Sequence, residues 1–256
     1  MVLRIFGYVT LLLVVLMPAH KAETTEGRAV VAVATNFLST ADALAKDFNH
    51  RFDLNISLVS GSSGKLYAQI RYGAPFDVFL SADQARPEQL VDDGLAHEDA
   101  RFTYAIGRLV LWSQKHSETE LVRSEAVLML SASKRIAYAN EALAPYGFAT
   151  VETLKALDLF EHLKSRMVRG ENVGQAYGLV SSGNADVGFI AMAQLTQRPN
   201  KGSYWLVDET LHTPIRQDAI LLNRGADNAA AQAFISYLRS DTAQGIIRNA
   251  GYRSED

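Results

Sequence analysis

The chain has 256 residues and no cysteine, and 48% of its residues are hydrophobic, which is enough to bury one large core or two modest ones. The missing cysteine excludes disulfides and the thiol through which a lipoprotein carries its lipid. The formal net charge of −3 argues against a nucleic-acid partner, which would select a basic face. A small anion stays compatible with this charge, because a local site can oppose the global sign.

The first 22 residues have the pattern of a secretory signal peptide. Arg4 precedes a short apolar run, Pro18 breaks that run, and Ala22 offers a small residue for cleavage. The run is short for a transmembrane span, although an uncleaved N-terminal anchor is the alternative. We therefore expect residues 1–22 to be removed on export to the periplasm. The mature chain then has a net charge of −5, because Arg4 and Lys21 are the charged residues of the leader.

The first part of the mature chain alternates predicted strands and helices. Short β-branched or alternating runs predict strands at 29–34, 55–59 and 77–80. Apolar residues at helical spacing, with Gly94 as the last stop, predict helices at 37–52, 64–70 and 84–93. This order is the βαβ pattern of a parallel sheet with helices on both faces.

The alternation continues in a second region. Strands are expected at 108–112, 135–139, near 168, and at 186–191, 204–207 and 215–222. Helices are expected at 151–157, 161–163, 173–180, 192–197, 229–239 and 243–250. We predict an α/β protein with two lobes, each a mostly parallel sheet flanked by helices. The first lobe would comprise 29–102 and 217–256, the second would comprise 103–216, and two crossovers would form a hinge.

Four junctions between a strand or loop and a following helix share one design. They are Thr35-Asn36, Ser62-Ser63-Gly64, Pro145-Tyr146-Gly147 and Asn172-Val173-Gly174. A helix start leaves backbone N–H groups unpaired and carries partial positive charge, so it attracts anions. Glycine lets the backbone approach a ligand closely, and Ser, Thr and Asn add side-chain donors. Because the same residues are ordinary helix caps, the pattern by itself indicates only a candidate anion cleft.

Six segments resemble, in the same order, the molybdate-binding components of bacterial ABC importers. They are 33–37, 61–70, 73–83, 101–112, 144–147 and 172–176, and together with their spacing they cover nearly the whole mature chain. The resemblance implies the type II periplasmic-binding-protein fold, with the ligand enclosed between two lobes. It also implies a monomeric receptor that delivers molybdate, and tungstate as well, to an inner-membrane ABC permease.

Carried over position by position, the resemblance places the oxyanion on Thr35, Asn36 and Ser63 of the first lobe and on Tyr146 and Val173 of the second. The first three would donate through hydroxyl, amide or main-chain groups, whereas Tyr146 and Val173 would mainly offer backbone N–H. Molybdenum would be held as molybdate through these residues, without a direct metal ligand and without a cofactor.

The chain departs from the family pattern in two places. Many members have a Ser-Ser pair where this chain has Thr35-Asn36, and a tyrosine in the region of 186–191 whose hydroxyl reaches the anion, where this chain has none. The sequence is similar to the Thr-Asn subgroup of the family, which implies that Asn36 supplies the missing donor. No role is assigned to Ala191.

Neutral donors suit the expected ligand. Molybdate and tungstate are dianions at neutral pH and only accept hydrogen bonds, and neutral donors avoid the desolvation of a buried countercharge. Sulfate has the same charge, so cavity size must discriminate against it. A receptor for another tetrahedral oxyanion, such as sulfate or phosphate, is therefore the alternative within this class.

An enzyme is the alternative from another class. The segment 61–65 lacks the spacing of a phosphate-binding loop, and no Gly-x-Ser-x-Gly elbow surrounds Ser63. The histidines beyond the leader are scattered, and none has metal-ligand spacing. We therefore expect no enzymatic activity, and a small serine hydrolase that uses Ser63 is the weaker hypothesis.

Overall fold

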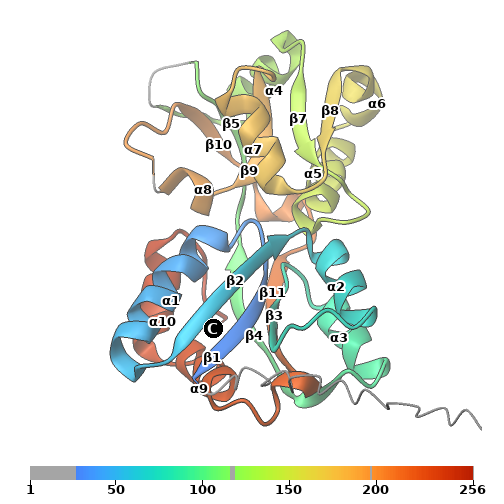
Figure 1. Cartoon of the computed structure of the whole chain (residues 1–256). Coiled ribbons are helices and arrows are strands. Elements are labelled where there is room, and N and C mark those ends of the chain that lie inside the picture. Colours follow the sequence, from blue (N-terminus) through green and yellow to red (C-terminus); the bar gives the residue numbers. More distant parts are fainter. Residues whose placement is uncertain (1–26, 116–118, 197, 256) are drawn as a thin grey trace, which may run out of the picture.

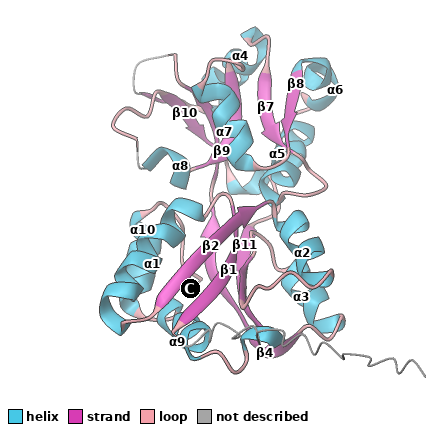
Figure 2. Cartoon of the chain, viewed as in Figure 1, coloured by secondary structure: helices cyan, strands magenta, loops and turns pink. Residues whose placement is uncertain are grey.

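The computed structural model describes residues 27–115, 119–196 and 198–255 (Figure 1). The predicted signal peptide at 1–22 lies outside the described residues. Two sheets with their helices form two bodies, one above the other in Figure 2. Over the ranges described, the structure contains no helix that is both long and apolar enough to cross a membrane. The predicted α/β class with two lobes is confirmed, and both sheets are mixed because each also contains antiparallel pairs.

The first sheet has the order β2-β1-β3-β11-β4. Its strands are β1 (Arg28–Ala34), β2 (Asn55–Gly61), β3 (Val78–Leu80), β4 (Ala96–Gly107) and β11 (Ile215–Leu222). β1 pairs in parallel with β2 and β3, whereas β11 runs antiparallel to β3 and β4. The helices of this body are α1 (Leu38–Phe52), α2 (Ser63–Arg71), α3 (Ala85–Asp92), α9 (Ala229–Leu238) and α10 (Asp241–Asn249).

Both faces of the first sheet are buried. Successive side chains of a strand point to opposite faces, so Val31 and Val33 join the core beneath α1, α9 and α10, while Ala32 joins the core beneath α2 and α3. Phe48 and Phe234 meet edge to face in the first of these cores, with ring centroids 5.3 Å apart. The central strands β1 and β3 are therefore apolar, as expected for a sheet with helices on both sides.

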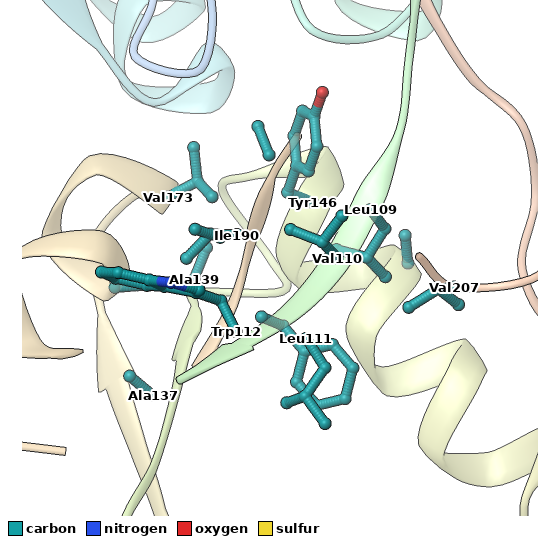
Figure 3. Packing of buried hydrophobic residues seen from close by; sticks show 14 of the residues in the cluster. Leu109, Val110, Leu111, Trp112, Ala137, Ala139, Tyr146, Val173, Ile190 and Val207 are labelled. Atoms are coloured by element: carbon teal, nitrogen blue, oxygen red, sulfur yellow. The ribbon is translucent and has the colours of Figure 1, made fainter. Parts of the chain in front are cut away.

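The second sheet has the order β6-β10-β5-β9-β7-β8. Its strands are β5 (Leu109–Ser113), β6 (Thr119–Glu120), β7 (Ile136–Ala139), β8 (Met167–Gly170), β9 (Val187–Ala191) and β10 (Ser203–Leu206). Its helices are α4 (Arg123–Ala132), α5 (Pro145–Ala156), α6 (Phe160–Leu163), α7 (Val173–Ser181) and α8 (Ala193–Thr196), and short 3₁₀ turns lie at Lys164–Arg166, Glu209–Leu211 and Asn223–Gly225. Figure 3 shows its core around Trp112 and Leu111, which Tyr146 and Val173 join from the helix starts.

The chain crosses between the bodies at two adjacent places. β4 ends at Gly107 and β5 begins at Leu109, while the return runs from β10 to β11, whose Ile215 pairs with Gly107. The predicted lobe boundaries at 102/103 and 216/217 fall inside β4 and β11, which pair with each other in the first sheet. The crossovers therefore lie side by side, close to the ends of these two strands.

Helix α4 and strand β4 were not expected from the sequence, and neither was the two-residue strand β6. In α4, Ala126 and Leu130 face the core but Leu128 is 70% exposed, so apolar residues surround the helix and hide its periodicity. The first part of β4 is polar and exposed, and it becomes a strand because β11 pairs with it. In addition, α5 begins at Pro145, earlier than the predicted 151, because the first turn contains a proline at a position that suits it.

Candidate functional site

Thr35 and Asn36 form the loop between β1 and α1. Thr35 N–H donates to the Gly61 carbonyl at 3.0 Å, which ties this loop to the end of β2. The Asn36 amide Nδ2 donates to Gln217 Oε1 at 2.8 Å and to the Tyr252 hydroxyl at 3.2 Å, and that hydroxyl donates to the Asn36 carbonyl at 2.7 Å. Both amide protons are thus already used inside the protein. Asn36 is 2% exposed, and its backbone N–H has no partner among the described residues.

Ser63 is the first residue of α2 and is 1% exposed. Its Oγ accepts a hydrogen bond from Ala82 N–H at 2.9 Å, so the hydroxyl proton is left to donate elsewhere. Its backbone N–H lies in the first helical turn and has no protein partner within the described ranges. The neighbouring Ser62 Oγ is also buried without a partner in the part of the chain that the structure describes.

Tyr146 and Val173 lie in the first turns of α5 and α7 and are each 2% exposed. Their side chains belong to the core of the second body (Figure 3). Asn172 caps α7 by accepting from Gln175 N–H at 3.0 Å, which leaves the N–H of Val173 free. The N–H groups of Tyr146 and Val173 bond to no other described residue. The second body therefore offers main-chain donors at this point.

Contacts between the two bodies bring the four junctions together. A methyl group at Gly174 would lie 3.5 Å from Thr35 Cβ, so the start of α7 abuts the loop after β1. Gly64 N–H donates to the Leu143 carbonyl at 2.9 Å, which joins the start of α2 to the segment before α5. Gln217 Nε2 lies 3.5 Å from the Tyr146 hydroxyl. All five residues predicted to bind the ligand thus gather where the two bodies meet.

The gathered groups are neutral hydrogen-bond donors. No ion pair and no hydrogen bond links a carboxylate to the five residues within the ranges described. Burial raises the pKa of Tyr146 far above its ordinary value, and the hydrogen bond with Gln217 opposes this by less, so the hydroxyl stays protonated. A buried N–H without an acceptor costs about 1–3 kcal/mol, so four of them where the two bodies meet favour a bound acceptor. An anion that only accepts hydrogen bonds meets this requirement.

Two grooves lie between the bodies, beside the four junctions. The larger, about 1030 Å³, is lined by Thr35, Gly174 and Arg198 among others. The smaller, about 380 Å³, is lined by Arg86, Pro145 and further residues, but by none of the five. Thr35 is also the one of the five that is partly exposed. The larger groove is therefore the side from which solvent approaches the candidate site.

The site has none of the partners that a serine hydrolase needs. Ser63 forms no hydrogen bond with a histidine, a lysine or a carboxylate of the described residues. Over the same ranges, no group of three or more His, Asp or Glu side chains lies close enough to hold a metal ion.

Three residues of the network around Asn36 were not expected from the sequence: Gln217, Tyr104 and Tyr252. The sequence offered no signal for Gln217, which is the middle of the three polar residues Arg216–Asp218 in β11.

Comparisons with known proteins agree with this architecture. The family model of bacterial extracellular solute-binding proteins matches residues 29–253. The chain is 39% identical over 229 residues to the molybdate-binding protein ModA of Rhodobacter capsulatus, with 90% of this chain and 89% of the relative covered. It is 42% identical over 224 residues to the protein of the same name from Azotobacter vinelandii, with 87% and 88% covered.

A solved structure extends this likeness to the fold. The structure titled Azotobacter vinelandii periplasmic molybdate-binding protein superposes with a TM-score of 0.84 at 39% identity, and the alignment covers 89% of this chain and 100% of that one. The superposition spans both sheets, and it confirms the predicted periplasmic-binding-protein fold.

Proposed function

This chain belongs to the family of bacterial extracellular solute-binding proteins, and from that premise we propose that it is the molybdate receptor of an ABC importer. One observation supports the proposal: buried, unpartnered N–H groups of Asn36, Ser63, Tyr146 and Val173 come from both bodies, at helix starts or loops that lie where the bodies meet. Thr35 completes the set at the groove. The names of the two similar ModA proteins and of the solved Azotobacter structure support molybdate as the ligand.

The site accepts the anion through main-chain and hydroxyl donors. Helix starts supply partial positive charge without a buried countercharge, so a dianion binds with no proton and no metal ligand from the protein. Tungstate has the same charge and shape, and we propose that it binds as well. The Ser63 hydroxyl has an unused proton, whereas the Asn36 amide does not, so Ser63 and the backbone N–H groups carry the binding on the first-lobe side.

The location of the protein and the motion of its lobes follow from this role. We propose that residues 1–22 are removed on export and that the mature chain works as a monomer in the periplasm, where it passes its ligand to an inner-membrane permease. The whole of β4 and β11 belongs to the first sheet, so the first lobe extends to the crossovers near Gly107 and Ile215, and the two lobes close by motion there. The protein has no cofactor and catalyses no reaction.

Calorimetric titration of the mature protein with molybdate, tungstate, sulfate and phosphate tests the ligand. Molybdate and tungstate should bind and raise the melting temperature, because a ligand that binds only the folded state stabilises it by mass action. Sulfate and phosphate should give little or no heat. A clear response to sulfate or phosphate with none to molybdate would replace the proposal by the other-oxyanion receptor. Ester turnover that disappears in Ser63→Ala would instead support the hydrolase.

A further inference from the structure

Gln217 lies at the centre of a hydrogen-bond network between the lobes. It is 0% exposed on β11. Its Oε1 accepts from Asn36 Nδ2 at 2.8 Å and from the Tyr104 hydroxyl at 3.1 Å, and its Nε2 donates to the Tyr146 hydroxyl at 3.5 Å. Asn36 follows β1 of the first sheet, whereas Tyr146 lies on α5 of the second body. One buried side chain therefore bridges two ligand-binding residues of opposite lobes.

An irregularity of the first sheet occurs at this residue. Gln217 pairs with Ala105 of β4, but the next residue, Asp218, pairs with Thr103. Tyr104 is thus the extra residue of a β-bulge, a feature that redirects side chains and is common beside functional sites. The Tyr104 hydroxyl also lies 3.0 Å from the Ser81 carbonyl, so its single proton is shared between the two acceptors. The bulge places the tyrosine where it holds the Oε1 end of Gln217, so that the Nε2 end is available to the second lobe.

The crossover from β4 to β5 also leaves room for the contact between Gln217 and Tyr146. A methyl group at Gly107, the last residue of β4, would overlap the Tyr146 hydroxyl and would lie 2.7 Å from Gln217 Nε2. The backbone of Gly107 is not in the left-handed region, so the glycine is needed for space. Both segments that connect the lobes therefore touch the hydroxyl of Tyr146, one through Gln217 and one through Gly107.

We propose that Gln217 is a positioning residue that couples lobe closure to ligand retention. It holds Asn36 and the Tyr146 hydroxyl in the arrangement that brings their backbone N–H groups to one point. Opening the lobes would break the contact of Gln217 Nε2 with Tyr146 and expose a buried polar network to water. Gln217 therefore slows release of the anion. This inference rests on the proposed function, because it concerns retention of molybdate.

Gln217→Met removes the bridge and nearly conserves the volume. The dissociation rate of labelled molybdate, measured in a chase with unlabelled molybdate, should rise about tenfold, and Kd should rise by the same factor, since changes at a formed interface act mostly on release. Gln244→Met is the matched control. Gln244 is also partly buried and donates to the Tyr104 and Leu238 carbonyls at 3.4 and 2.9 Å, but it lies on α10 and bridges no lobes. The control should lower the melting temperature and leave the dissociation rate unchanged.

Tyr146→Phe gives a second measurement that does not depend on the folding of Gln217→Met. It keeps the backbone N–H and removes only the hydroxyl, so release should accelerate several-fold. In the double variant, Gln217→Met should accelerate release less than it does in the wild type, because its partner is gone. A wild-type dissociation rate in both single variants, or effects that simply multiply in the double variant, would overturn the inference alone. Wild-type protein that binds no molybdate would overturn the proposed function and this inference together.

Discussion

The two lobes build their halves of the candidate site by different means. On the first-lobe side, the side chains of Asn36 and Ser63 are tied into hydrogen bonds with Gln217, Tyr252 and the Ala82 backbone. On the second-lobe side, Tyr146 and Val173 bury their side chains in the apolar core and offer backbone N–H groups at helix starts. One half is held by a polar network and the other by packing.

This difference determines which substitutions matter. A main-chain donor is removed only by proline, so most side-chain changes on the second-lobe side should alter stability and leave binding intact. A side-chain donor is removed by a single truncation. Mutations in the first lobe should therefore change affinity directly, while those in the second lobe should act through the backbone or through closure.

Val173→Pro should have the largest effect on affinity. Val173 is the first residue of α7 and the preceding Asn172 is extended (φ −150°, ψ 172°), so proline fits the helix and removes only the N–H. A hydrogen bond to a charged group contributes about 1.5–3 kcal/mol, so the molybdate Kd in calorimetry should rise roughly 10- to 150-fold. Val173→Ala keeps the N–H and should keep the affinity despite a lower melting temperature. Equal weakening by both variants would show that the side chain, and not the main chain, carries the contact.

Ser63→Ala should weaken binding about tenfold and also destabilise the fold. The variant loses a hydroxyl donor and leaves the buried N–H of Ala82 without its acceptor, at a cost of about 1–3 kcal/mol. Calorimetry and urea unfolding measure the two effects. Ser131→Ala is the control, because Ser131 is exposed on α4 and its hydroxyl donates to the Val127 carbonyl of the same helix. A lower stability with unchanged Kd would limit Ser63 to a structural role.

Two glycines of α7 separate closure from helix stability. Gly174→Ala would place a methyl group 3.1 Å from Asn172 Oδ1 and 3.5 Å from Thr35 Cβ of the opposite lobe, so the lobes must part slightly and Kd should rise about threefold, within the modest cost of tight packing. At Gly178 nothing lies within 4 Å of such a methyl group. Gly178→Ala should therefore leave Kd unchanged and stabilise the helix by about 0.5–1 kcal/mol, visible as a higher melting temperature. Equal changes of Kd in both variants would show that the contact between Gly174 and Thr35 does not control closure.

Alkaline pH should lower the stability of the fold through the buried tyrosines of the network at the lobe boundary. Burial raises the pKa of Tyr104, Tyr146 and Tyr252 well above the ordinary value near 10. Because the folded-state pKa is the higher one, their contribution is fully present below about pH 10 and is lost as the unfolded state ionises above it. The melting temperature should fall above that pH, and tyrosinate absorbance of these residues should appear only with unfolding. Tyr146→Phe should reduce the loss more than Tyr72→Phe, since Tyr72 is 92% exposed. Tyrosinate formation from all tyrosines in the folded protein would contradict the burial of the network.

Much of the fold followed from local pattern. The βαβ order of the first lobe, the alternation in the second and the starts of α2 and α7 were predicted, because apolar period and turn residues are encoded within short windows. Helix α4 was not predicted, because the exposed Leu128 hides its apolar periodicity. Strand β4 was not predicted, because its polar half becomes a strand through pairing with β11. The four junctions were recognised as helix starts, but a cap and an anion-binding start look the same in sequence.

The sequence by itself determined most of the elements, the five residues predicted to hold the anion and, through its identity with relatives, the family. Tertiary structure decided that the junctions of the two lobes lie against each other, because Thr35 reaches Gly174 and Gly64 reaches Leu143 only across the lobes. It also decided which groups have free donors. The Asn36 amide is used by Gln217 and Tyr252, residues about 180 and 216 positions away, and hydrogen bonds over such separations depend on how the two sheets and the C-terminal segment pack.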